Sequence, residues 1–257
     1  MDKKEERDQF FPHERLHAYA RALTFVQLAG AWIDSWPSRF AVRNQLDRAM
    51  ESIIANLARA VRYQRTDKGT YLLECSLGSV LECAACLDVA ERRLPVGTDH
   101  MREGKLLLQE IARMEVGLRS SWLEPMCAKE ESEPYEAGEQ RYFNHESLDV
   151  FQRSLQLHDV LGGLLLGVHG EHRYARRIDD MSTSLTLNIA EGNGRFSMRD
   201  HGNFADAAED AAIKLAGYLD LVDAAWGTDM GQAKSLLREI MAMLEGLKGY
   251  LATESDE

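Results

Sequence analysis

The stretch from Met181 to Phe204, MSTSLTLNIAEGNGRFSMRDHGNF, decides the fold. Its first part predicts a helix, because Met181, Leu185 and Ile189 follow one another at intervals of four residues and therefore share one face. Gly192-Asn193-Gly194 then interrupts the pattern, since glycine and asparagine accept backbone angles that other residues resist. A second apolar stripe begins at Phe204. The stretch therefore predicts a helix, a glycine corner and a second helix.

The same pattern occurs earlier in the chain, at a nearly constant distance. The offset in residue number is 132 before the corner and 133 after it, where the glycine corner is replaced by Ala60-Val61. The matched residues are Ser52 and Ser184, Asn56 and Asn188, Arg62 and Arg195, Asp67 and Asp200, and Tyr71 and Phe204. Such a match over two helices indicates an internal repeat.

The repeat extends to the other helices of each half. In the first helix His13-Glu14 matches His145-Glu146 and Arg21 matches Arg153, at an offset of 132. In the fourth helix the offset is 129, with these matches: Lys105 and Lys234, Glu110 and Glu239, Met114 and Met243. Short connections force antiparallel neighbours. We therefore expect an all-α fold of two tandem antiparallel up-down-up-down four-helix bundles, residues 10–123 and 142–252, joined by an acidic linker, 124–141.

Composition limits the class of protein. The chain has 257 residues, 45% of them hydrophobic, and a net charge of −12. The longest apolar run, Val160 to Val168, is far shorter than the roughly 20 residues that cross a bilayer. The charged N-terminus, MDKKEERDQ, is unlike a signal peptide, and the four cysteines follow no disulfide framework. These features predict a cytoplasmic protein that does not associate with membranes.

The charge is distributed unevenly between the halves. Residues 10–123 contain 15 Lys and Arg against 13 Asp and Glu, a net of +2, whereas residues 142–252 contain 10 against 16, a net of −6. A cluster of cations on the second helix and its corner suits phosphate oxygens: Arg39, Arg43, Arg48, Arg59, Arg62, Arg65 and Lys68. The alternative is a solvated helix face with intrahelical ion pairs, or a surface that contacts a protein partner.

The segment His13-Glu14-Arg15-Leu16-His17 matches H-E-x-x-H, in which two imidazoles bind zinc and the glutamate activates water. It lies at the very start of a predicted helix, and no third ligand follows at a fixed spacing. In the repeat, Asp149 replaces the second histidine while the apolar pattern persists. A helix start with an acidic first turn explains the segment better, so we expect no metal site.

Other candidate motifs also have structural interpretations. Cys83 and Cys86 form a C-x-x-C within a helix, where small core residues are the simpler interpretation. His169 and His172 fall at an interhelix corner, and Glu191 has no evident catalytic partner, so we expect it to bond backbone amides. No nucleophile–base set is found. We therefore expect no enzyme activity, no catalytic residues, no cofactor and no small-molecule substrate.

The run Asn188-Ile189-Ala190-Glu191-Gly192, followed by Gly194-Arg195, resembles the bacterial intervening-sequence proteins, which are encoded in insertions within large-subunit ribosomal RNA genes. The accessory variability determinant of diversity-generating retroelements has a similar fold. The resemblance covers nearly all of the second half and reaches the first half through the repeat. It implies small four-helix bundles without catalysis, ring-like homo-oligomers such as pentamers, and, for the retroelement member, binding of RNA and a reverse transcriptase. A fused tandem departs from the single-bundle pattern of the family.

Two hypotheses about function remain. The first is an accessory protein that binds structured RNA, a reverse transcriptase or both through the Arg-rich edge of the first bundle. It requires the seven cations to share one exposed face. The second is an acidic scaffold that self-associates or binds a protein without nucleic acid. It predicts exposed apolar residues on a bundle face, with the arginines dispersed or paired.

Overall fold

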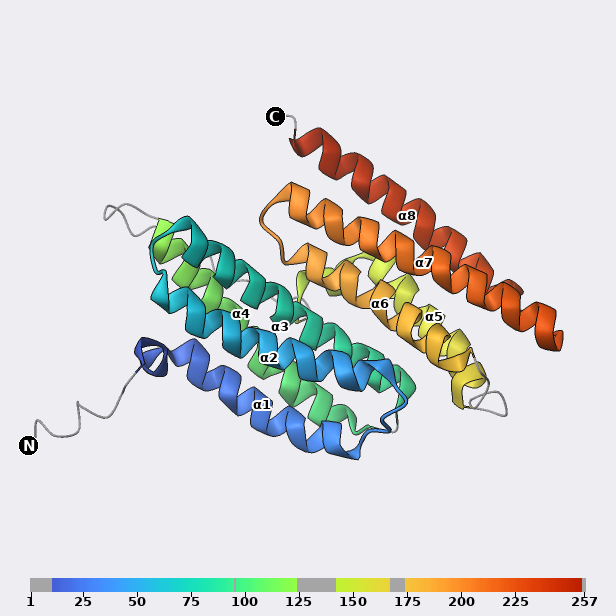
Figure 1. The fold of residues 1–257 in the computed structure, drawn as a ribbon, viewed down its shortest axis with the longest axis horizontal. Coiled ribbons are helices and arrows are strands. Elements are labelled where there is room, and N and C mark those ends of the chain that lie inside the picture. Colours follow the sequence, from blue (N-terminus) through green and yellow to red (C-terminus); the bar gives the residue numbers. More distant parts are fainter. Residues whose placement is uncertain (1–10, 95, 124–141, 167–173, 256–257) are drawn as a thin grey trace, which may run out of the picture.

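The computed structural model describes residues 11–94, 96–123, 142–166 and 174–255 (Figure 1). These residues form helices and connecting segments with no strand among them, so the predicted all-α class is confirmed. The helices are α1 (His17–Ser35), α2 (Ala41–Arg62), α3 (Asp67–Arg93), α4 (Thr98–Leu123), α5 (Asp149–Leu166), α6 (Ala175–Asn193), α7 (Met198–Trp226) and α8 (Gly231–Ser255), with short 3-10 helices η2 (Pro12–Arg15) before α1 and η3 (Asn144–Ser147) before α5.

Each half arranges its four helices in the same way. In the first half α1 contacts α2 and α4, and α3 contacts α2 and α4. In the second half α5 contacts α6 and α8, and α7 contacts α6 and α8. Consecutive helices are therefore neighbours and the last helix packs back on the first, which is the up-down-up-down bundle arrangement (Figure 1).

Equivalent side chains make the same contacts in the two halves. Arg21 pairs with Glu110 in the first half, and their matches Arg153 and Glu239 pair in the second. Asn56 Nδ2 donates to Ser52 Oγ at 3.1 Å, and their matches Asn188 and Ser184 form the same hydrogen bond at the same distance. These recurring contacts support the internal repeat.

The glycine corner between α6 and α7 has a different physical basis from the one expected. Neither Gly192 nor Gly194 has a positive φ, so the expectation that unusual backbone angles require glycine here is wrong. The space around them is what requires it. A Cβ on Gly192 would lie 2.9 Å from the Cβ of Phe204, and one on Gly194 would lie 2.5 Å from Cδ1 of Leu81. The corner glycines allow close packing of α6 against α7 and against α3 of the other half.

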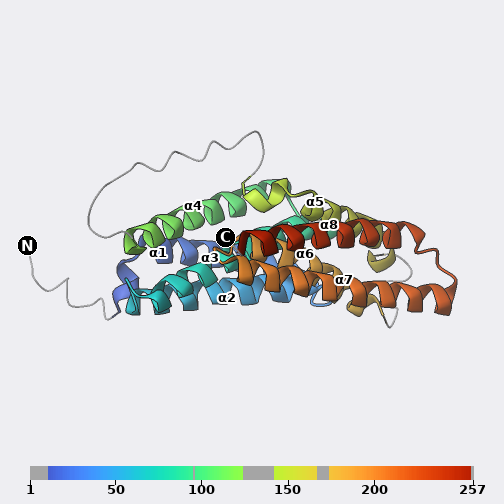
Figure 2. The same ribbon diagram turned by 90° about the horizontal axis from the view of Figure 1, so that it is seen from above.

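The two halves pack directly against each other. Helix α3 contacts α5 and α6, and α2 contacts α6 (Figure 2). The buried side chains of both halves therefore join into one cluster. The helix sets follow the predicted division at 10–123 and 142–252, whose limits as domains stay a prediction. The predicted linker, 124–141, and the corner with His169 and His172 lie outside the described residues. None of the described helices is long and apolar enough to span a membrane.

Candidate functional site

The seven predicted cations lie along α2 and the corner that follows it. Arg39 precedes α2, four arginines lie on the helix, Arg65 is in the corner and Lys68 is in the first turn of α3. All are exposed except Arg43, which is half-buried because its Nε donates to the carbonyl of Ile33 at 3.0 Å. Solvent therefore reaches six of the seven charges.

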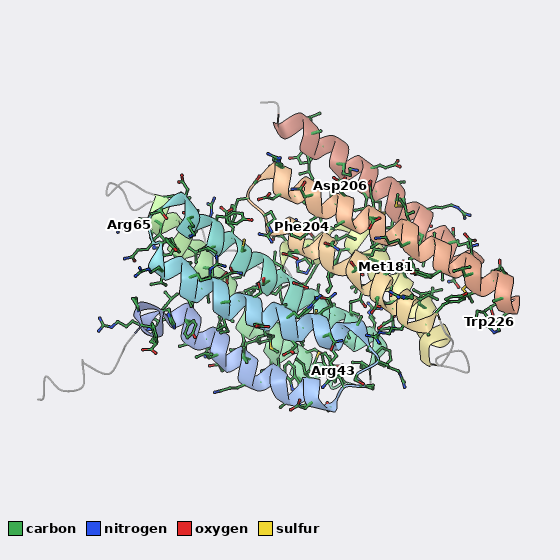
Figure 3. The ribbon with its side chains drawn as sticks, in the orientation of Figure 1. Arg43, Arg65, Met181, Phe204, Asp206 and Trp226 are labelled. Atoms are coloured by element: carbon green, nitrogen blue, oxygen red, sulfur yellow. The ribbon has the colours of Figure 1, made fainter. Side chains whose placement is uncertain are left out.

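The cations form two groups instead of one compact patch. Helix α2 has 22 residues and is therefore about 33 Å long at about 1.5 Å per residue. Arg43 lies near one end and Arg65 just beyond the other (Figure 3). The denser group stands at the C-terminal end of α2, and we call its members the corner cations: Arg59, Arg62, Arg65 and Lys68.

Among the described residues, none of the seven cations forms an ion pair. Arg48 bonds to Gln45 and not to Asp47 or Glu51, so the intrahelical ion pairs of the alternative interpretation are not formed. The ammonium of Lys68 lies 3.8 Å from the ring centroid of Tyr63. Its hydrogen bond and its charge lower the pKa of that phenol. The positive charge of the cluster is therefore left for an external anion.

A cleft of about 400 Å³ opens next to the corner cations, where α2 and α3 meet the α6–α7 corner. It brings two of the predicted cations together with polar residues of both halves. Its walls are formed by Ser52, Asn56, Arg59, Lys68, Tyr71, Leu72, Cys75, Ser79, Glu191 and Arg195. The Asn-Ser hydrogen bond of the first half therefore faces a site that both halves build.

Arg195 and Glu191, from the motif that carries the family resemblance, connect the two halves across this cleft. Arg195 donates to Glu191 at 2.6 Å, and its Nη1 lies 3.5 Å from Sγ of Cys75 in α3. Its guanidinium also covers Gly78, where an added Cβ would lie 3.1 Å from Cζ. Glu191 thus bonds a side chain, and the expectation of backbone amides is wrong. Burial raises the pKa of Glu191, and the charge of Arg195 opposes that rise.

Two buried ionic networks hold the rest of the junction, and the sequence interpretation missed both. Arg93 of α3 pairs with Asp179 of α6 at 2.6 Å, with both side chains almost fully buried, and donates to Nδ1 of His158 at 3.0 Å. Asp179 also accepts the backbone N–H of Ala41 at 2.5 Å. These polar residues interrupt strongly apolar helix faces. That interruption was the signal in the sequence from which buried polar contacts could have been predicted.

In the second network, Lys105 of α4 lies between Asp88 of α3 and Glu146 of η3. Its ammonium bonds to Asp88 and, at 2.9 Å, to Oε1 of Glu146. Burial raises the pKa of Asp88 to about 6, and the neighbouring ammonium opposes that rise. The match of Lys105 with Lys234 marked this position in the sequence, but nothing in the sequence showed that Lys105 is buried by the other half.

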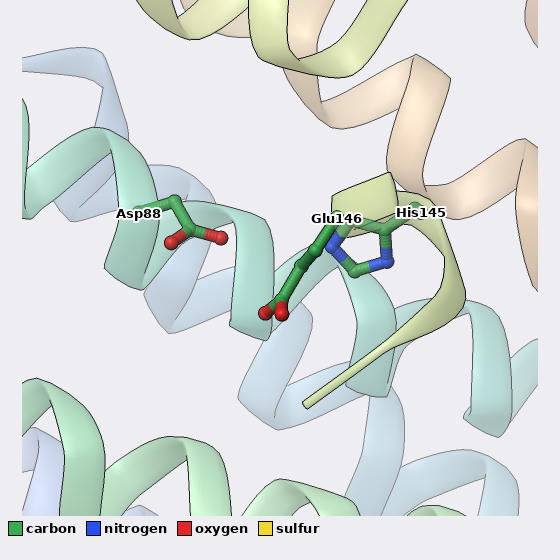
Figure 4. Close-up of side chains that lie close together, drawn as sticks. All are labelled: Asp88, His145 and Glu146. Atoms are coloured by element: carbon green, nitrogen blue, oxygen red, sulfur yellow. The ribbon is translucent and has the colours of Figure 1, made fainter. Parts of the chain in front are cut away.

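Asp88, His145 and Glu146 place potential metal ligand atoms within 4.8 Å of one another (Figure 4). The ammonium of Lys105 already bonds to both carboxylates, so one positive charge is shared between Asp88 and Glu146. Burial lowers the pKa of His145 to about 3, which keeps its ring neutral. The ring stacks on Phe143 and meets Phe151 edge-on, with centroids 5.7 and 4.7 Å away. His145 is a packing residue in this arrangement.

The remaining candidate motifs also have packing roles. His13 stacks on Phe11 and contacts Tyr19, as its match His145 stacks on Phe143 and contacts Phe151. In the part of the chain that the structure describes, His13 and His17 belong to no group of three potential metal ligands. Cys83 and Cys86 are fully buried on α3, and burial raises the pKa of both thiols well above the usual value.

The described residues thus define a helical-bundle protein with an unpaired cationic edge. Residues 14–117 match the model of a protein family described as 23S rRNA-intervening sequence protein. This match supports an intervening-sequence protein family, which is not a known enzyme family. It falls in the first half, whereas the motif that carries the resemblance lies in the second. No curated protein and no solved structure matches the chain.

Proposed function

We propose that this protein is a non-enzymatic helical accessory protein that binds structured RNA through the corner cations of its first half. One observation carries the proposal. The corner cations are exposed and have no ion pair among the described residues, and two of them, Arg59 and Lys68, line a cleft of about 400 Å³. Arginine forks suit phosphate oxygens, and contacts to phosphates release counterions from the nucleic acid.

The charge distribution supports the first half as the binding side. Residues 10–123 carry 15 cations against 13 anions, a net of +2, whereas 142–252 carry 10 against 16, a net of −6. Surface charges act over about 8 Å at physiological salt, so the second half repels a phosphate backbone that approaches it. The resemblance to the retroelement accessory determinant extends the proposal to a reverse transcriptase as a second partner. The name of the matched family refers to 23S rRNA, which makes a ribosomal RNA hairpin a suitable first probe.

The test is a fluorescence polarisation titration of such a hairpin at several salt concentrations. Replacing Arg59, Arg62 and Arg65 by Ala should weaken binding about equally for different RNA sequences. It should also reduce the salt slope by up to about three units, one for each phosphate that the variant no longer binds. The matched control replaces three exposed arginines elsewhere, Arg102, Arg113 and Arg199, and should change the slope much less. Absence of binding at low salt would refute the proposal.

A self-associating scaffold without nucleic-acid binding is the second candidate. The observation in its favour is an exposed apolar surface between α7 and α8, where Ile213, 61% exposed, lines a hollow together with Ala216 and Met241. Isolated apolar side chains on a surface are common, but a contiguous face indicates a contact with another protein surface. Light scattering discriminates this candidate from an RNA-binding single chain, because only the scaffold requires a mass above that of one chain, 29.0 kDa.

A further inference from the structure

The junction inside the chain joins two unlike surfaces. The first half contributes mainly the α3/α4 face, with part of α2, and the second contributes the α5/α6 face together with η3. The contacts across it pair Arg92 with Asp159, Arg93 with Asp179, Lys105 with Glu146, and Gln109 with the carbonyl of Tyr142. A contact between unlike surfaces is heterologous, so it leaves one surface of each kind unused.

Both faces have repeat copies elsewhere in the chain. The copy of the α3/α4 face is the α7/α8 face. In the contacting part of α3 and α7 the offset is 132, one less than at Tyr71 and Phe204, because Leu87-Asp88 recurs as Leu219-Asp220. Along α4 and α8 it is 129, because Lys105 recurs as Lys234. Lys234 pairs with Asp220 as Lys105 pairs with Asp88. The copy of the α5/α6 face is the α1/α2 face with η2. Figure 1 places α1 and α2 on one side of the molecule and α7 and α8 on the opposite side.

The side chains that the junction buries are exposed in these copies. Leu81 of the α3/α4 face is 7% exposed, whereas its repeat copy, Ile213, is 61% exposed. Leu155 of the α5/α6 face is 4% exposed, whereas its repeat copy, Leu23, is 41% exposed. Both copies thus retain large apolar side chains although the chain itself covers neither.

The α7/α8 face is hollowed where the ion pair lies. A cavity of about 460 Å³ opens between the helices, with Asp220, Lys234 and Leu237 on its wall. These are the copies of Asp88, Lys105 and Leu108. On the α3/α4 face the carboxylate of Glu146 reaches the corresponding lysine. The hollow therefore lies where a second glutamate of this kind would enter.

Glu14 is that glutamate on the α1/α2 face. Glu146 accepts the backbone N–H of Tyr142 through Oε2 at 2.6 Å and uses Oε1 for Lys105. Glu14 accepts the N–H of Phe11 through Oε2 at 3.4 Å, and the described residues show no partner for its Oε1. Glu14 is exposed, so it is placed to meet a lysine from another chain as Glu146 meets Lys105.

We propose that copies of this chain join head to tail, with the α1/α2 face of one copy on the α7/α8 face of the next and Glu14 against Lys234. The net charges of +2 and −6 on the two halves favour this order. The contact between copies differs from the junction inside the chain at one position. In the junction Gly194 approaches Leu81, whereas the repeat match of Gly194 in the first half is the larger residue Val61. Since every copy contributes two bundles, a closed ring contains an even number of them. The proposal deepens the self-association candidate by naming its surfaces.

The test uses two charge-reversed full-length chains, Glu14→Lys and Lys234→Glu. The first has lysines at both positions and the second has glutamates at both, so like charges face each other when either variant is alone. We expect each variant alone to associate at least tenfold more weakly than the wild type. An equimolar mixture should assemble again, because every contact then joins a lysine to a glutamate. Light scattering over a range of concentrations measures the mass of each sample.

Two controls make every outcome decisive. Glu103→Lys and Arg113→Glu reverse charges at exposed positions of α4, which belongs to neither face, and should leave the mass unchanged. Circular dichroism shows whether each variant is folded, and reassembly of the mixture cannot come from unfolded chains. A wild type that stays at 29.0 kDa at all concentrations would refute self-association itself. A wild-type assembly that either variant leaves intact would refute only the assignment of these faces. Neither result bears on RNA binding, which the titration at several salt concentrations measures.

Discussion

The chain contains the same lysine–aspartate pair twice, in two environments. Lys105 and Asp88 have side chains 11% and 12% exposed, whereas Lys234 and Asp220 are 22% and 66% exposed. The residues, helices and pairing are equivalent, and the difference is that η3 and α5 of the other half cover the first pair. Burial at this position is therefore decided by what docks on the helix face, and the local sequence alone does not reveal it.

The same ion pair should contribute differently to the free energy of unfolding in the two environments. An exposed ion pair contributes about 0–1 kcal/mol, because water screens it and side-chain entropy opposes it. Removing one partner of a buried pair costs about 3–5 kcal/mol, because the remaining charge loses its compensation. The contacts across the junction contain both kinds side by side, so they allow this comparison to be tested within one protein.

The largest effect is expected at Arg93. Replacing Arg93 by Met should lower the free energy of unfolding by about 3–5 kcal/mol, since Asp179 would stay buried without its guanidinium. Replacing its neighbour Arg92 by Met should cost no more than about 1 kcal/mol, because the pair with Asp159 is more than 40% exposed on both sides. Urea unfolding of both variants measures the difference. Equal costs would contradict the buried junction.

A smaller difference is expected between the repeat copies themselves. Lys105→Met should destabilise the protein by about 3 kcal/mol, because two carboxylates lose their shared ammonium. Lys234→Met should change stability by less than about 1 kcal/mol in the single chain. Urea unfolding at low protein concentration compares them without a contribution from self-association. A cost at Lys234 as large as that at Lys105 would show that the α7/α8 face is covered as well.

Glu115 should make the stability of the first half depend on pH. The second half lacks this effect, because the match of Glu115 there is the core residue Leu244. Burial raises the pKa of Glu115 to about 8, and the hydrogen bond from Ser76 at 2.7 Å opposes the rise only in part. A raised carboxyl pKa contributes stability that is complete below the unfolded-state pKa and is lost as pH rises through the folded-state pKa. The wild type should therefore lose stability between about pH 4.5 and pH 8.

Glu115→Gln keeps the shape of the side chain and removes its titration. We expect this variant to exceed the wild type by about 2 kcal/mol at pH 6 and by more toward pH 8, and to equal it near pH 4.5, because each pH unit between the two pKa values is worth about 1.4 kcal/mol. Thermal unfolding over this pH range, followed by circular dichroism, gives the two curves. Parallel curves for the two proteins would exclude Glu115 as the source of the pH dependence.

The smallest effect is expected for the ion pairs that both halves share. Arg21 with Glu110, and Arg153 with Glu239, are all 40–44% exposed, so each pair should contribute about 0–1 kcal/mol. A double-mutant cycle to alanine in each half measures the two coupling energies, and the repeat predicts equal values. A difference above about 1 kcal/mol would show that the two bundles position these helices differently.

Most of the fold could be predicted because it depends on periodicity. Apolar residues at helical spacing located the helices. The repeat offsets matched Arg153 with Arg21 and Glu239 with Glu110, and in the structure these matched residues form equivalent ion pairs. The reason for the glycine corner could not be predicted. It comes from the approach of Leu81, which belongs to the other half of the chain.

The candidate site was predicted less completely. The cations of α2 were identified from their clustering in the sequence, but the sequence did not show that Arg59 and Lys68 line a cleft together with Arg195 of the other half. Arg195 belongs to the recognised motif, but its contacts with Cys75 and Gly78 depend on how the halves dock. Asp179 and His158 were missed for the same reason, because contacts between distant helices leave no periodic signal.

Disulfide trapping between copies tests most directly whether the two uncovered faces meet. A chain with Glu14→Cys and Lys234→Cys should form, under mild oxidation, a ladder of covalently linked chains on a non-reducing gel. Each single variant should give no ladder, because a chain with one new cysteine cannot link to two neighbours through these positions. A head-to-tail contact predicts the ladder at the lowest concentration at which the wild type assembles. Absence of the ladder while the wild type remains assembled would contradict it.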